Sequence, residues 1–232
     1  MLFETEPHST TIVPTVRPAR TLPTNTRICG ISILAGGSSS RMGRTKASLR
    51  LGRRTLLGHV RACARNSGLP HRVIRRDLVP RCGPLGGVYT ALATSRVQTI
   101  VFLSCDMPFI SADLVKSLLR RFGPRTKALF VTENGRVGFP FVLRRATLPI
   151  VERLLARRRL SLQQLASALR ARTARLPLRR RHELFNINTR EDLQAARKRW
   201  RSGLVISQPG KPTKWSADFS PVQSSSSLEP EE

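Results

Sequence analysis

The sequence is poor in acidic and aromatic side chains, and these shortages narrow the classes of protein to which it can belong. Its 232 residues include 14 Asp and Glu against 41 Lys and Arg, a formal net charge of +27. Such an excess fits nucleic acid, an anionic membrane surface or small anionic substrates. Nucleic-acid modules stack bases on aromatic rings, yet only 5% of this chain is Phe, Trp or Tyr. We therefore rank a basic nucleic-acid or anion binder without turnover second among the possible functions.

The sequence also lacks the signals of metal ribbons, secretion and membrane spans. No two of its four cysteines form a CxxC pair, which excludes a zinc ribbon or a thioredoxin-type site. No apolar run reaches the roughly 18 residues of a membrane span, and the first residues lack a basic segment followed by an apolar core. We therefore expect a cytoplasmic protein without membrane contact. Its cysteines should be reduced and mostly buried: Cys29, Cys63, Cys82 and Cys105.

Composition divides the chain into one domain with two tails. Residues 1–26 are rich in Thr and Pro and have no apolar periodicity, which predicts a disordered N-terminal arm. Residues 207–232 are rich in Ser and Pro and end in acidic residues, which predicts a disordered C-terminal tail. The remaining 27–206 are long enough for a single α/β domain with a substantial core.

Apolar runs alternate with amphipathic segments along this domain, and the alternation predicts an open sheet with helical crossovers. The run at 98–104 is continuously apolar and should be a central parallel strand. We thus expect the α/β class, as a three-layer α/β/α domain with a mostly parallel sheet. Strands are predicted at 27–34, 71–75, 98–104, 127–132, 139–143 and 184–188, and helices at 55–66, 88–93 after a Gly/Pro first turn, 112–122, 147–157, 161–172 and after Thr189.

The segment 31–46 is an apolar strand that breaks into a loop of small residues and two cations. Gly36 and Gly37 have no Cβ, so backbone N–H groups there can approach an anion closely. Arg41 can donate two parallel hydrogen bonds to phosphate oxygens, and Lys46 supplies a mobile point charge. The spacing fits neither GxGxxG nor GxxxxGK[ST], so neither a dinucleotide-binding fold nor a P-loop is indicated. A glycine-rich turn followed by a solvated basic segment is the alternative.

Asp106 is the acidic residue best placed for chemistry. It follows the strand 98–104, whose carboxyl end should lie at the same edge of the sheet as the loop of Gly36. Mg²⁺ commonly takes one or two carboxylates and completes its shell with phosphate oxygens and water. Asp106 is therefore a candidate metal ligand, although a turn residue before Pro108 would look the same in the local sequence.

Four motifs in order resemble those of the molybdenum cofactor guanylyltransferase family, whose fold is a Rossmann-like nucleotidyltransferase fold. The opening motif is Leu34-Ala35-Gly36-Gly37, followed by Ser39 to Gly43 and Lys46. The second glycine motif is Gly83 to Gly87, the metal segment is Leu103 to Ile110, and the closing segment is Asn186-Ile187-Asn188-Thr189. Together they span about residues 31–193, and such an ordered set is hard to obtain by chance.

The resemblance implies a Mg²⁺-dependent transfer of GMP from GTP to molybdopterin that carries molybdenum, with release of pyrophosphate. It implies catalytic roles for Arg41, Lys46 and Asp106, with Asp106 on the metal. It further implies molybdoenzymes or other cofactor-biosynthesis proteins as candidate partners of a monomer or weak oligomer. The residues that it assigns to binding the nucleotide or the pterin are Leu34, Ala35, Gly36, Gly37, Lys46, Asp77, Asp106, Asn186 and Asn188.

The chain departs from the family pattern between Asn66 and Asp77, where a strand with an asparagine for the nucleotide and a connection are missing. Either 71–75 takes the place of that strand or the sheet is one strand narrower, so the wall that recognises the base is altered. A CTP-using or other small-molecule nucleotidyltransferase, and a nucleotide-binding protein that has lost turnover, are the alternatives. The arginine runs 157–159 and 179–181 are expected to be solvated, or to attract an anionic substrate if they border the site.

Overall fold

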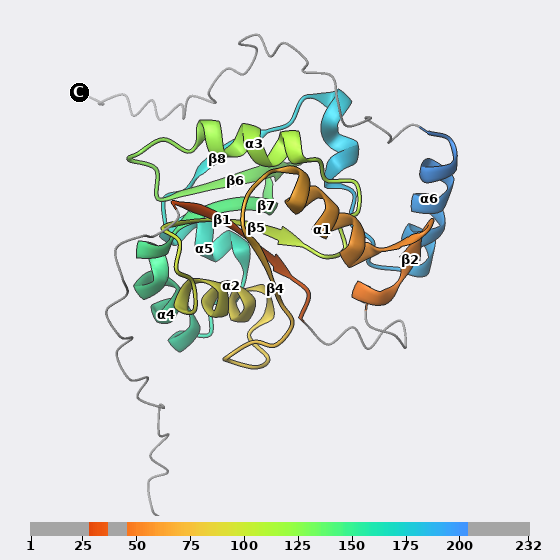
Figure 1. The fold of residues 1–232 in the computed structure, drawn as a ribbon. Helices are drawn as coiled ribbons and strands as arrows, with labels where there is room; N and C mark the ends of the chain where they lie inside the picture. The colour runs from red at the N-terminus through yellow and green to blue at the C-terminus, as the bar shows by residue number, and fades with distance from the viewer. Residues whose placement is uncertain (1–27, 37–45, 204–232) are drawn as a thin grey trace, which may run out of the picture.

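A six-stranded sheet lies at the centre of the computed structural model, which describes residues 28–36 and 46–203 (Figure 1). Its strand order is β4-β1-β5-β7-β6-β8. The pairs β1/β4, β1/β5 and β6/β8 are parallel, whereas β7 is antiparallel to both of its neighbours. The predicted mostly parallel sheet is confirmed. The strands are β1 (Cys29–Leu34), β4 (His71–Ile74), β5 (Thr99–Ser104), β6 (Ala128–Glu133), β7 (Arg136–Arg144) and β8 (Arg172–Arg175).

Helices cover both faces of this sheet and give the expected three layers. Helices α1 (Leu56–Asn66) and α3 (Ala112–Arg121) pack on one face, against Val101 and Leu103. Helices α2 (Gly83–Ala93), α4 (Leu148–Ala156) and α5 (Leu162–Ala168) pack on the other face, against Ile100 and Phe102 (Figure 1). Because alternate residues of β5 enter opposite cores, the strand is apolar throughout its middle. Each such side chain stabilises the fold by about 1.5–3 kcal/mol relative to an exposed one.

A smaller apolar cluster lies beside the sheet and joins the hairpin β2 (Arg50–Leu51) and β3 (Arg54–Thr55) to α6 (Arg190–Arg201). Trp200 of α6 packs edge-on against His59 at 4.8 Å between ring centroids. A Cβ on Gly52 would lie 2.7 Å from the Trp200 ring nitrogen, so this turn has to be glycine, and its φ of 60° agrees. Short 3-10 helices complete the described fold: η2 (Lys46–Ser48), η3 (Arg145–Thr147) and η4 (Leu178–Leu184).

Two predictions of local structure are wrong, and both concern the region after α5. The predicted helix 161–172 ends at Ala168, and Arg172–Arg175 forms the edge strand β8, in which only Ala174 is buried. The predicted strand 184–188 is the end of η4 followed by irregular chain. There the Ile187 N–H donates to the carbonyl oxygen of Asp106 at 3.0 Å instead of joining the sheet. The segment is thereby held next to the end of β5.

The other elements agree with their patterns within a few residues. Asn134 and Gly135 turn between β6 and β7 with φ of 48° and 75°, as the predicted hairpin requires. The Thr189 side chain accepts from the Asp192 N–H at 3.1 Å, in the predicted capping box of α6. The strand at 71–75 is present as β4 and forms the sheet edge beside β1. None of the helices in residues 28–36 and 46–203 is long and apolar enough to cross a bilayer.

The predicted arm 1–26 and tail 207–232 lie outside the described residues, as do Gly37 and Arg41.

All four cysteines are free, and only Cys29 is partly exposed. Burial raises the pKa of the Cys63 and Cys105 thiols to about 12, with smaller contributions from the nearby carboxylates of Glu183 and Asp106. Both thiols are therefore expected to stay protonated at neutral pH.

Candidate active site

The carboxylate of Asp106 stands at the carboxyl end of β5 and is held by the strand that precedes it. Its Oδ1 accepts a hydrogen bond from the Ser104 hydroxyl at 2.5 Å. Its Oδ2 lies 3.6 Å from Lys46 Nζ, with the two side chains 15% and 22% exposed. Lys46 begins η2, which follows the loop after β1, so the predicted convergence of this lysine with Asp106 is seen in the fold. Ser104 lies in the metal segment named from the sequence, but its contact with the carboxylate was not predicted.

Lys46 also connects Asp106 to the closing segment. Its Nζ donates to Asn188 Oδ1 at 2.6 Å. The backbone N–H groups of Asn188 and Thr189 in turn donate to Asp192 Oδ2 at 2.8 and 2.9 Å. These hydrogen bonds, the one from Asn188 first, lower the pKa of Asp192, and the Lys46 charge adds to the effect. Asp192 is thus more than the helix cap that the sequence predicted, because it fixes the backbone that presents Asn188.

The end of β1 brings the predicted nucleotide loop to the same edge of the sheet. Leu34 is paired with Ser104, and its carbonyl oxygen accepts from the Cys105 N–H at 3.1 Å. Ala35 N–H donates to the carbonyl oxygen of Ile74 in β4 at 2.8 Å. The chain at Gly36 therefore leaves the sheet between β4 and β5, ten residues before Lys46. The arrangement is that of an α/β sheet with a ligand site at its carboxyl edge.

Asp77 lies against three glycines, and its carboxylate leaves no room for a Cβ at Gly86. A Cβ on Gly86 would lie 2.8 Å from Asp77 Oδ2, and one on Gly36 or Gly87 would lie 3.4 Å from Oδ1. The second glycine motif, at the start of α2, thus packs directly on this carboxylate and on Leu34, which is 3.0 Å from a Cβ on Gly87. Burial among these neighbours raises the pKa of Asp77.

The raised pKa predicts that Asp77→Asn stabilises the fold at neutral pH. Because the folded state binds the proton more tightly than the unfolded chain, the free energy of unfolding falls as pH rises from about 4 through the folded pKa. At pH 7 the variant is expected to melt at a higher temperature than the wild type, and below about pH 3 the two should coincide. Thermal melts at both pH values measure this. Glu152→Gln, an exposed carboxylate of α4, is the control, and an equal gain in that variant would contradict the explanation.

The other predicted site residues are the two asparagines of the closing segment, Asn186 and Asn188. Asn186 and Asn188 are both exposed on either side of the buried Ile187, and Asn188 is the one that contacts Lys46.

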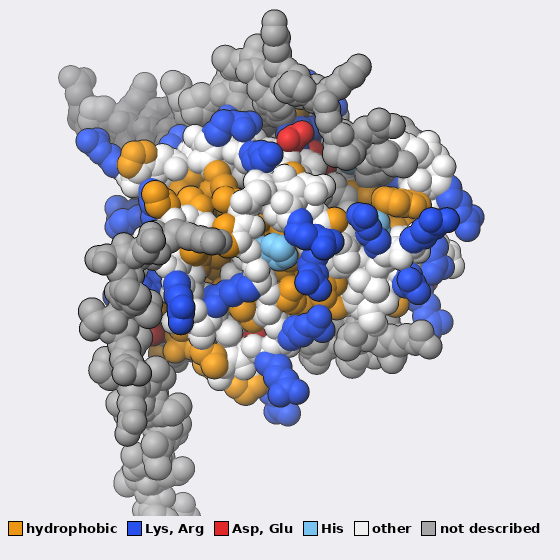
Figure 2. Space-filling model, in the orientation of Figure 1, with side chains coloured by type: hydrophobic (Ala, Val, Ile, Leu, Met, Phe, Trp, Pro, Cys, Tyr) orange, Lys and Arg blue, Asp and Glu red, His pale blue; other side chains and the backbone are white. Residues whose placement is uncertain are grey.

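On the face shown in Figure 2, Lys and Arg side chains are spread over much of the described surface, and acidic side chains are few. On this face the cations do not gather into one patch, which agrees with their spread along the sequence.

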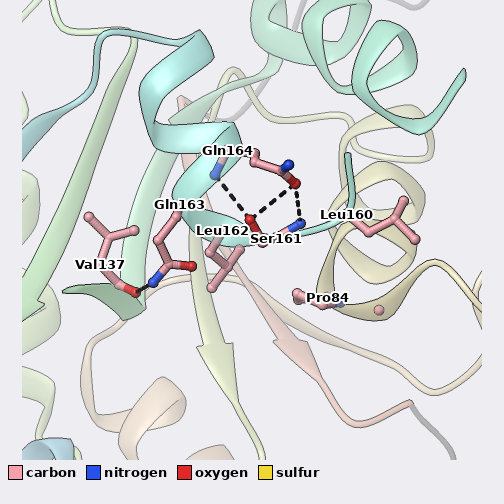
Figure 3. Close-up of a pocket in the computed structure, with 8 residues that line it drawn as sticks. Pro84, Val137, Leu160, Ser161, Leu162, Gln163 and Gln164 are labelled. Carbon is pink, nitrogen blue, oxygen red and sulfur yellow. Dashed lines mark hydrogen bonds between the residues drawn. The ribbon is translucent and has the colours of Figure 1, made fainter. Parts of the chain in front are cut away.

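An open surface pocket of about 600 Å³ lies between the start of α2, the start of β7 and the start of α5 (Figure 3). Gln163 lines it, and its side-chain amide donates to the carbonyl oxygen of Val137 at 3.1 Å. Ser161 and Gln164 form the capping box of α5 at its rim. Its walls are Gly83, Pro84, Val137, Leu160, Ser161, Leu162, Gln163 and Gln164. Gly83 and Pro84 belong to the second glycine motif, but among the described residues none of those predicted to bind substrate or metal lines this pocket.

Known proteins resemble this chain in sequence. Residues 31–174, more than half of the chain, match the family model described as a MobA-like NTP transferase domain. A probable molybdenum cofactor guanylyltransferase of Flavobacterium johnsoniae is 27% identical over 176 residues, which cover 69% of this chain and 92% of the relative.

Two solved structures illustrate the shared fold. Molybdopterin-guanine dinucleotide biosynthesis protein A from Archaeoglobus fulgidus superposes with a TM-score of 0.57 at 19% identity, covering 75% of this chain and 99% of that one. The 2-C-methyl-D-erythritol 4-phosphate cytidylyltransferase from Thermus thermophilus has a TM-score of 0.56 at 20% identity, covering 75% of this chain and 100% of its own. The fold therefore agrees with that of nucleotidyltransferases, and it does not distinguish between nucleotides.

Proposed function

Because the chain belongs to the MobA-like NTP transferase domain family, we propose that it transfers GMP from GTP to molybdopterin that carries molybdenum, and releases pyrophosphate. The observation that carries the proposal is the convergence of Lys46, Asp106 and Asn188 where β1 and β5 end. The similarity to a probable guanylyltransferase supports the choice of GTP and of the acceptor. The proposed site lies between Gly36, which follows β1, and the closing segment 186–189.

In the proposed reaction an oxygen of the pterin phosphate attacks the α-phosphorus of GTP. A new P–O bond forms, the bond to the bridging oxygen breaks, and its electron pair leaves with pyrophosphate. Lys46, with Arg41 from the loop, would offset the negative charge that grows on the leaving group. A phosphate nucleophile is already ionised, so the protein needs no general base, which agrees with a chain of only 4 histidines.

The carboxyl edge of the sheet also fits one Mg²⁺ held jointly by protein and nucleotide. At 3.6 Å from Lys46 Nζ, Asp106 Oδ2 is beyond ordinary hydrogen-bond length and keeps its capacity for a cation. No cluster of three or more His, Cys, Asp and Glu is placed to hold a metal in the described part of the chain. Phosphate oxygens and water would therefore supply the other ligands. When bound, the ion would neutralise charge on the phosphates.

The nucleotide preference depends on the region where the chain is shorter than its family pattern. Here β4 forms the sheet edge directly beside β1, and the chain continues from it through Arg75 and Arg76 to Asp77. We propose that this edge borders the base and that Asp77 contacts the nucleotide, since its carboxylate lies beside Gly36, Gly86 and Gly87.

The test is a turnover assay of the full chain with Mg²⁺, molybdopterin carrying molybdenum, and each of the four nucleoside triphosphates. Pyrophosphate release is expected to be fastest with GTP and to require the acceptor. Faster release with CTP would replace the guanylyl assignment with a cytidylyl one. Binding of a nucleotide without pyrophosphate release, whichever triphosphate is supplied, would contradict the proposal and favour a binding protein without turnover.

A further inference from the structure

The sequence predicted the arginine run 179–181 as a solvated face or a substrate-attracting border, and Arg179 and Arg181 are indeed exposed. Arg180, by contrast, is buried in an ion pair with Glu183. Arg180 and Glu183 of η4 are only 9% and 4% exposed. Arg180 Nε donates to Glu183 Oε1, and Arg180 Nη2 donates to Ser111 Oγ at 2.9 Å. Glu183 Oε2 accepts from the Ser111 N–H at 3.0 Å and from its hydroxyl at 2.6 Å. The three residues form a closed network between two segments that are far apart in the sequence.

The network joins η4 to the first turn of α3. Ser111 is the N-cap of α3, and its Oγ also accepts from the Leu114 N–H at 3.1 Å. Two charges taken out of water gain little stability compared with apolar side chains of similar size, even when they are well paired. Such a pair does, however, hold its partners in one arrangement, since breaking it would leave a charge buried alone. Its main physical consequence is therefore a fixed geometry between η4 and α3.

The two segments that it joins carry the two halves of the proposed site. Ser111 ends the loop that begins with Asp106, and Glu183 precedes the segment that carries Asn188. Beyond the network the segments stay side by side, because the Ile187 N–H donates to the Asp106 carbonyl oxygen at 3.0 Å. Phe109 and Phe185 pack between these two connections, with 6.0 Å between ring centroids.

We propose that Glu183, held by Arg180 and Ser111, is a positioning residue that sets Asn188, and through it Lys46 Nζ, relative to Asp106. The inference rests on the proposed function for its kinetic consequence. Asn188 Oδ1 receives its 2.6 Å hydrogen bond from Lys46 only if the closing segment stays in register with the loop of Asp106. A shift of about 1 Å between groups that hold a triphosphate is enough to lower a rate by about 10²-fold.

The first test needs no substrate and follows the Ile187 amide by hydrogen exchange in the full chain. Glu183→Gln keeps the side-chain shape and one oxygen for Ser111 but removes the charge that pairs with Arg180. Exchange at Ile187 is expected to become about tenfold faster, while exchange at Ile33 in β1, which is paired on both sides in the sheet, stays unchanged. The matched control is Arg144→Gln, because Arg144 anchors the other end of α3 through the carbonyl oxygens of Gly123 and Pro124. That variant should leave Ile187 protected.

The second test is a double-mutant cycle on turnover with Glu183→Gln and Asn188→Ala. Glu183→Gln is expected to lower kcat about tenfold with little change in the KM for GTP, and to have no further effect once Asn188 is gone. Arg144→Gln combined with Asn188→Ala should be additive. If Glu183→Gln does not fold, Ser111→Ala removes part of the same network and should change both readouts less, in the same direction.

Unchanged exchange at Ile187, a change equal to that at Ile33, or additive kinetics with Asn188→Ala would each overturn the inference. A wild-type chain that releases no pyrophosphate with any triphosphate would instead overturn the proposed function. The exchange measurement would still decide whether Glu183 positions the closing segment.

Discussion

Replacement of Asp106 by asparagine is expected to lower the rate of pyrophosphate release by roughly 10²- to 10³-fold, since a preorganised charge in the transition state is lost. The amide can still accept from the Ser104 hydroxyl, as Oδ1 does at 2.5 Å, so the local shape should be kept. What disappears is the negative charge that faces Lys46 and the proposed Mg²⁺. The measurement is turnover with GTP and the acceptor over a range of Mg²⁺ concentrations.

The control for this variant is Asp113→Asn, an exposed carboxylate in the first turn of α3. It should keep the wild-type rate. The stability cost of Asp106→Asn should stay below about 1 kcal/mol, because the ion pair with Lys46 is partly solvated. A wild-type rate for Asp106→Asn at every Mg²⁺ concentration would contradict the proposed metal role.

Replacement of Lys46 by methionine is expected to have the second largest effect, a loss of roughly 10²-fold in kcat together with weaker binding of the triphosphate. Methionine keeps most of the stem but removes the charge and the 2.6 Å hydrogen bond to Asn188. Lys46→Arg should restore only part of the activity. The planar guanidinium group of arginine does not replace the compact ammonium group of lysine, which lies close to both Asp106 and Asn188.

Titration of GTP against Lys46→Met, followed by calorimetry, separates the loss of binding from the loss of turnover. Lys116→Met provides the matched control, as Lys116 is exposed on α3. If Lys46→Met bound GTP and released pyrophosphate like the wild type, the charge of Lys46 would have no part in the reaction. A nucleic-acid binder, the second hypothesis from composition, would instead bind DNA or RNA tightly and with a steep salt dependence in both variants.

The sequence predicted elements well where burial leaves a strong local pattern. Strand β5 is buried on both faces, so its residues are apolar in succession and its assignment needs no tertiary information. The turn at Asn134 and Gly135 was equally clear, because few other residues accept a positive φ. By contrast, β8 has a single buried residue, Ala174, so its pattern contains almost no hydrophobic signal and the strand was missed. The segment 184–188 was mistaken for a strand because burial of Ile187 beside Asp106 looks the same in sequence.

The sequence by itself determined the fold class and the residues that meet at the strand ends, since glycines, a lysine and a carboxylate placed after apolar strands must arrive at one edge of a parallel sheet. Only the tertiary structure decided which of them touch: that Lys46 lies between Asp106 and Asn188, and that Asp77 packs on the glycines of α2. It also decided that Arg180, in a run of arginines, is buried on Glu183 rather than solvated. The physical reason is that such contacts join residues far apart in the chain, and their distances depend on how helices and loops pack, which no local pattern records.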